Sequence, residues 1–199
     1  MWETVFYLLI AFVFAFVFLF VFWKNLKDDY IPSQIFSTSL IVLIFIGVGY
    51  FLSTIFKSYA FWIIFLSLIV GYIIGSIKCG IKFYEGFDSF IISSLFAFMA
   101  TSPILYKYWQ LNLILIYSAI VLSAVVFYVI KKNYKSFVWY KSGRRGFPGL
   151  FTLGIFFLIR SIVAIIKPES IFLLTEYDIF ISGLISLISF LNIFVLGGK

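Results

Sequence analysis

Seven long runs of apolar residues, separated by short polar stretches, constrain the fold of this chain more than any other feature. As a helix rising about 1.5 Å per residue, each run is long enough to cross the ~30 Å hydrocarbon core of a membrane. A lone strand would leave its backbone polar groups unpaired in lipid, so helices are expected even where phenylalanine alternates with other residues, in 12–22. The sequence therefore predicts an all-α, polytopic membrane helix bundle in a single domain, 1–199. The seven predicted spans are 4–23, 38–56, 60–77, 88–105, 109–130, 147–166 and 178–196.

Composition agrees with a multi-pass protein of the plasma membrane. Hydrophobic residues make up 64% of the chain and charged residues 12%, whereas a soluble domain is about 25% charged. The chain contains no histidine, and Cys79 is its one cysteine. A zinc cluster or a disulfide framework is therefore excluded, and we expect neither a metal nor a cofactor. Cys79 falls at the end of a span, where we favour a packing thiol over a palmitoylation site.

The distribution of basic residues predicts the orientation of the chain. The odd-numbered loops and the C-terminus carry eleven of the fifteen, the even-numbered loops carry three, and Arg160 lies within a span. Because cytoplasmic loops are enriched in lysine and arginine, the N-terminus is predicted outside and the C-terminus in the cytoplasm. The same rule explains the basic loop 131–149, so nucleic acid is not an expected partner. The eleven are Lys24, Lys27, Lys78, Lys82, Lys131, Lys132, Lys135, Lys141, Arg144, Arg145 and Lys199, and the three are Lys57, Lys107 and Lys167.

Small residues recur at every fourth position along the third and fourth spans, and this spacing lets helix backbones approach closely. We favour packing within the chain over a homodimer face. The two stripes are Ser67, Gly71, Gly75 and Cys79, and Ser89, Ser93, Ala97 and Thr101.

Few carboxylates are placed for catalysis. Glu85 and Asp88 could pair as acid and base, but Asp88 is predicted to cap the N-terminus of the fourth helix. Asp178 is predicted to cap the last helix in the same way. No catalytic residue is therefore assigned.

Arg160 is the one charged residue deep within a predicted span. It lies seven residues before Lys167, or about 10 Å from the outer end of its helix. The side chain could snorkel to the surface, or it could have a partner within the membrane. Since we expect no Asp or Glu at similar depth, the partner of Arg160 would be a polar side chain, a backbone carbonyl, water or an external anion. A phospholipid phosphate fits because a guanidinium binds it bidentately.

Around this arginine the chain resembles the prolipoprotein diacylglyceryl transferases. "GLFTLGIFFLIRSIVAIIK" (Gly149–Lys167) is similar to the family's penultimate span, and "YWQLNLILIYSAIVLSAVVFYVIKK" (Tyr108–Lys132) to the helix that begins at its PSQLYE motif. "GVGYFLSTIF" (Gly47–Phe56) is similar to the second-span pattern GRxGYVLFY. The resemblance extends over about residues 105–199 and is thin before them.

The resemblance implies transfer of diacylglyceryl from phosphatidylglycerol to the lipobox cysteine of a pre-lipoprotein. Its partners would be phosphatidylglycerol and the signal peptide of that substrate. Arg160 would take the place of the family's arginine near the lipid headgroup, with Lys167, Gln110 and Tyr50 on matching positions. These four residues form the predicted headgroup site.

Several family residues are replaced in this chain. The family's His-Gly-Gly motif is missing, and "TSPILYKYW" (Thr101–Trp109) stands where the signature GRxGNFxNGE belongs. Val48 and Ala164 replace a family arginine and glutamate. Without histidine, a thiol with a pKa near 8.5 has no evident base. Two interpretations therefore stay open: a minimal transferase, or a non-catalytic relative that binds phospholipid or acts in a membrane assembly. A small transporter ranks third because paired carboxylates within the spans are missing.

Overall fold

The computed structural model describes residues 2–109, 113–137, 146–166 and 177–197, and these residues form seven α-helices and no strand. The predicted all-α class is confirmed. The second helix begins six residues before its predicted span, and the fourth begins five residues before, because each has a polar first turn ahead of its apolar run. The helices are α1 (Trp2–Leu26), α2 (Pro32–Ile55), α3 (Ala60–Cys79), α4 (Phe83–Trp109), α5 (Leu113–Asn133), α6 (Phe147–Ile166) and α7 (Asp178–Gly197), with short 3₁₀ turns at Lys57–Tyr59 and Tyr134–Ser136.

Five of these helices are long and apolar enough to cross a membrane. They are α1 from Leu8, α2, α3 with the turn that precedes it, α6 and α7. The structure thus supports a membrane protein, while membrane crossing by α4 and α5 stays a prediction.

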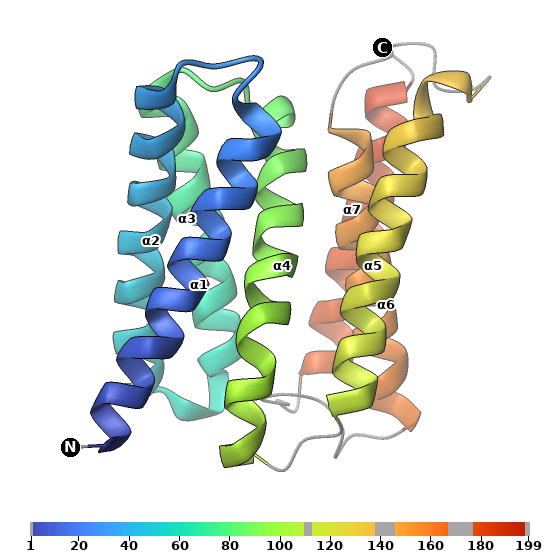
Figure 1. Ribbon diagram of the computed structural model, residues 1–199. Helices are drawn as coiled ribbons and strands as arrows, with labels where there is room; N and C mark the ends of the chain where they lie inside the picture. The colour runs from blue at the N-terminus through green and yellow to red at the C-terminus, as the bar shows by residue number, and fades with distance from the viewer. Residues whose placement is uncertain (1, 110–112, 138–145, 167–176, 198–199) are drawn as a thin grey trace.

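The helices run alongside one another in an upright bundle (Figure 1). α2 packs on α3, α1 on α4, and both α5 and α7 on α6. Contacts of α4 with α5 and α6 join the first four helices to the last three. α1, α3 and α5 end at the same end of the bundle (Figure 1). We call this end the basic end because seven lysines lie at or next to it: Lys24, Lys27, Lys78, Lys82, Lys131, Lys132 and Lys135.

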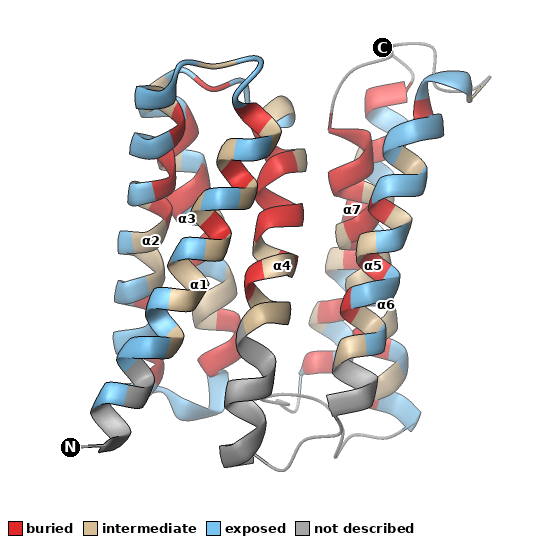
Figure 2. Cartoon of the chain, in the orientation of Figure 1, coloured by how far each residue is buried: buried red, intermediate tan, exposed pale blue. Residues whose placement is uncertain are grey.

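The phenylalanine series of α1 shows how one helix serves both core and lipid. Phe14, Phe18 and Phe22 stack on one another along the inner face, with ring centroids 6.4 and 5.7 Å apart. Phe12 and Phe16 are exposed on the opposite face. Figure 2 shows the same division in α1 and α2, whose outward faces are exposed while the buried residues face the other helices. The alternation in sequence therefore resolves into two helical faces, as the requirement for paired backbone groups predicted.

Small residues of α3 bring α2 and α3 close together. A Cβ added at Gly71 would lie 2.8 Å from the Phe45 Cβ, and one at Gly75 would lie 3.0 Å from the Thr38 Cγ2. Thr38 and Phe45 both belong to α2, so this stripe packs within the chain. Ser89, Ser93 and Ala97 of the second stripe are also buried.

At the basic end, the connection between α1 and α2 docks on the start of α4. The Tyr30 hydroxyl donates to Glu85 Oε2 at 2.7 Å and accepts from the Lys82 amide at 3.1 Å. Burial and the adjacent Glu85 carboxylate raise the pKa of Tyr30. Gln34 Nε2 donates to the Cys79 carbonyl oxygen at 2.9 Å. Glu85, which the sequence offered as an acid–base partner of Asp88, is thus engaged by Tyr30.

Candidate functional site: the buried Arg160–Asp178 pair

Arg160 points into the bundle from the second half of α6. The helix starts with Phe147-Pro148-Gly149, and proline suits a first turn because its missing N–H has no partner there in any case. The buried face of α6 then includes Thr152, Gly154, Phe157, Arg160, Ser161 and Ala164. Arg160 continues a face of mainly small and apolar residues, so its charge lies inside the protein and does not snorkel along the lipid surface.

Asp178, the first residue of α7, is the counter-ion of Arg160. Arg160 Nη2 donates to Asp178 Oδ2 at 2.7 Å, and Nε donates to Oδ1 at 3.3 Å. The side chains are 8% and 0% exposed. The guanidinium therefore meets both carboxylate oxygens, in a bidentate, charge-assisted arrangement. We call these two residues the buried ion pair.

The expectation that no carboxylate lies at the depth of Arg160 was wrong. α6 continues for six residues beyond Arg160, about 9 Å, whereas α7 begins at the level of Arg160 itself. Because α6 and α7 pack side by side in opposite directions, the first residue of α7 meets the middle of the second half of α6 (Figure 1). Asp178 does begin the last helix, as predicted, but its side chain binds the arginine.

Aromatic residues from the start of α3 enclose the pair. The Arg160 Cζ lies 3.7 Å from the centroid of the Phe61 ring and 5.9 Å from that of Trp62. Phe65 and the fully buried Phe157 pack against the same rings, at centroid distances of 5.9 to 6.4 Å. Stacking on aromatic faces adds a cation–π attraction to the ion pair. The pair therefore fastens three helices, α3, α6 and α7, at one level.

Serine hydroxyls extend this contact between α6 and α7. Ser161 Oγ donates to the Ile179 carbonyl oxygen at 3.1 Å, and Ser186 Oγ donates to that of Gly154 at 2.9 Å. Ser182 Oγ is buried between them without a hydrogen-bond partner among the described residues. The two helices are therefore held by polar contacts as well as by packing.

The predicted headgroup residues are not brought together in the part of the chain that the structure describes. Tyr50 lies on α2 and is 54% exposed, whereas the described partners of Arg160 belong to α3 and α7. Gln110 and Lys167 lie outside the described residues. The assignment of these four residues to one headgroup site stays a prediction.

Asp88 forms a second contact between distant helices, near the basic end. Its Oδ2 accepts from the Gly146 amide at 3.0 Å, and its Oδ1 accepts from the Gly149 amide at 2.6 Å. The prediction that Asp88 caps α4 was wrong, because α4 already begins at Phe83. Asp88 caps α6 instead, and the Gly149 amide that it binds lies 61 residues after it in the sequence. The only sequence signal was a helix start at Phe147-Pro148-Gly149 without its own Ser, Thr, Asp or Asn immediately before it.

Asp88 and Asp178 are therefore both engaged by donors from α6 or the residue before it. Asp178 accepts hydrogen bonds from a guanidinium, and Asp88 accepts hydrogen bonds from two backbone amides. Neither is placed to take a proton from a substrate thiol, as a general base must be. Across the described ranges, no group of three or more His, Cys, Asp or Glu side chains could hold a metal ion.

Comparisons of the chain with protein-family models, with curated proteins and with solved structures found no significant match.

Proposed function

We propose that this chain is a non-catalytic, multi-pass protein of the plasma membrane that binds an anionic phospholipid. The observation that carries the proposal is the separation of charge along the bundle. In the half of the bundle away from the basic end, the arginine is neutralised by Asp178. At the basic end, seven lysines lie where the apolar helices stop. Such cations attract anionic headgroups by ~1 kcal/mol each near a membrane surface.

In the part of the chain that the structure describes, no acid–base group is placed for catalysis, and this supports the non-catalytic part of the proposal. The chain has no histidine, and the described carboxylates of Asp88 and Asp178 hold helices together. The headgroup role first predicted for Arg160 is also weakened, because a paired guanidinium has little net charge to offer a phosphate. We therefore place the headgroup at the basic end.

A lipid-transfer assay tests this proposal. The purified full chain would be mixed with phosphatidylglycerol and a lipobox peptide, and lipid retained by the protein would be measured by native mass spectrometry. We expect phosphatidylglycerol to be retained in preference to phosphatidylcholine, with no thioether product. A protein that retains neither lipid would contradict the proposal. A thioether product would contradict its non-catalytic part and favour the transferase, the second candidate, which the resemblance of Gly149–Lys167 supports.

The proposed topology has seven spans, with the N-terminus outside and the basic end in the cytoplasm. In a Cys79→Ala background, a Ser136→Cys variant is expected to react with a membrane-impermeant thiol reagent only after the cells are permeabilised. Ser136 lies exposed just beyond α5 at the basic end. Lys57→Cys is the matched control, because Lys57 is exposed at the opposite end, between α2 and α3. It should react in intact cells. The reverse labelling pattern would overturn the orientation.

A further inference from the structure

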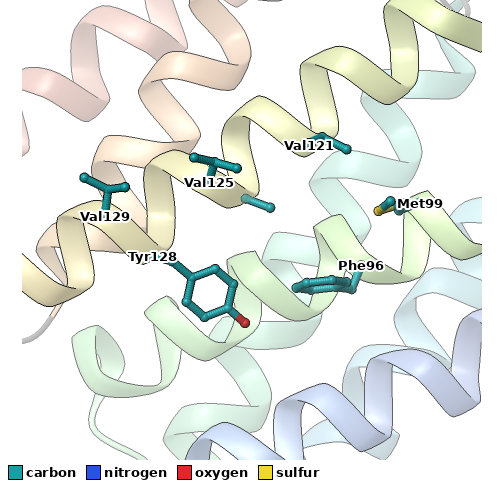
Figure 3. Close-up of a pocket in the computed structure, with 7 residues that line it drawn as sticks. Phe96, Met99, Val121, Val125, Tyr128 and Val129 are labelled. Carbon is teal, nitrogen blue, oxygen red and sulfur yellow. The ribbon is translucent and has the colours of Figure 1, made fainter.

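An apolar groove of about 360 Å³ runs between α4 and α5. Phe96 and Met99 line it from α4, and Val125, Tyr128 and Val129 line it from α5 (Figure 3). The Tyr128 ring reaches from α5 toward α4 (Figure 3). Apart from the Tyr128 hydroxyl, every lining side chain is apolar. The groove therefore suits a hydrocarbon chain and offers no site for a polar ligand within it.

The α5 wall of the groove leads directly to a cation. Ala124, Tyr128 and Lys132 follow one another at intervals of four residues, so they lie on one stripe of the helix. Lys132 is exposed, and it comes one turn after Tyr128 at the basic end. A molecule lying along this stripe would meet apolar side chains, then a tyrosine, then an ammonium group.

The neighbouring lysine is engaged elsewhere. Lys131 Nζ donates to the Asn25 Oδ1 of α1 at 3.2 Å and lies over the Phe127 ring. The two adjacent lysines of α5 therefore differ: Lys131 ties α5 to α1, whereas Lys132 continues the stripe that lines the groove.

We propose that the α4–α5 groove binds one acyl chain of an anionic glycerophospholipid, whose phosphate contacts Lys132. This inference rests on the proposed function and gives it a location. Charge complementarity selects the occupant, because the order apolar groove, tyrosine, cation repeats the order acyl chain, ester region, phosphate. Tyrosine is also favoured at the headgroup level of membranes.

Matched substitutions test the groove in the full-length protein purified in mild detergent. Retained dioleoyl phosphatidylglycerol and dioleoyl phosphatidylcholine would be counted by native mass spectrometry. Ala124→Trp fills the groove, and it should abolish retention of phosphatidylglycerol. Leu122→Trp places the same side chain at an exposed position of α5 that does not line the groove, and it should retain lipid as the parent does.

A charge substitution provides a test that does not depend on how the groove accommodates tryptophan. Lys132→Gln should weaken retention of phosphatidylglycerol about five-fold, the effect of removing one cation near a membrane surface. Lys57→Gln removes an exposed cation at the opposite end of the bundle, between α2 and α3, and it should leave retention unchanged.

The possible failures are distinguishable. If the parent retains no phosphatidylglycerol, the proposed function fails together with the groove. If the parent retains it, but Lys132→Gln and Lys57→Gln behave alike, phospholipid binding stands and the groove assignment is overturned. If Ala124→Trp changes the oligomeric state while lipid retention stays the same, a helix of a second copy occupies the groove, which also overturns the assignment.

Discussion

Replacing Arg160 with leucine is expected to lower the free energy of unfolding by about 3–5 kcal/mol, because the carboxylate of Asp178 would then be buried without its counter-ion. Asp178 is 0% exposed, so water cannot take the place of the guanidinium without opening the contact between α6 and α7. The loss would be measured by thermal and denaturant unfolding of the purified protein, with and without added phospholipid. It should be the same in both conditions, since the pair is internal.

A double-mutant cycle separates this pairing from the packing of the arginine side chain. Arg160→Leu combined with Asp178→Leu removes both charges, so the double variant should be more stable than either single variant. Arg160→Lys keeps the charge but loses the bidentate fork and the stacking on Phe61, so its stability should be intermediate. Additive losses in the double variant would contradict a coupled pair. Stabilisation by Arg160→Leu alone would show that Asp178 needs no counter-ion.

The second large effect is expected at Asp88. Asp88→Ala should lower the free energy of unfolding by about 2 kcal/mol, because two backbone amides at the start of α6 would lose a charged acceptor. The effect should also be local. Hydrogen exchange followed by mass spectrometry should show faster exchange in a peptide that covers residues 146–151, whose Gly146 and Gly149 amides bind Asp88.

Two further substitutions calibrate this result. Asp88→Asn keeps an acceptor oxygen without the charge, so its effect should be smaller than that of Asp88→Ala. Glu85 lies one turn before Asp88 on α4 and contacts Tyr30, not α6. Glu85→Gln should therefore leave exchange at residues 146–151 unchanged. Unchanged exchange in Asp88→Ala would mean that the cap contributes nothing to the start of α6.

The helices could be predicted from sequence because each one contains a long apolar run of its own. The inward and outward phenylalanines of α1 follow from helical periodicity alone, and so does the close packing of Gly71 and Gly75. The Lys131–Asn25 contact, by contrast, joins residues 106 apart. Periodicity assigns a residue to a face of its helix but does not identify the residue that this face meets.

The functional contacts illustrate the same limit. Arg160 was recognised as unusual because charge at membrane depth is rare. The sequence does not identify its partner, because Asp178 is the first residue of the last predicted span and is therefore expected at the membrane surface. Only the relative height of α6 and α7 brings the two together. Asp88 was assigned to the helix in which it lies, whereas its acceptor atoms serve a helix that begins far along the chain.

The position of Asp178 also has a consequence for how the protein is made. A ribosome completes α6 before it reaches the residue that neutralises Arg160, so during synthesis the arginine helix exists for a time without its counter-ion. An arginine at the centre of a single inserted helix costs about 2.5–3.5 kcal/mol. Transfer of α6 into the lipid is therefore more favourable once the first turn of α7 has emerged, and the two helices are best inserted together as a hairpin. In this chain α7 supplies the counter-ion and thereby makes the insertion of the helix before it less costly.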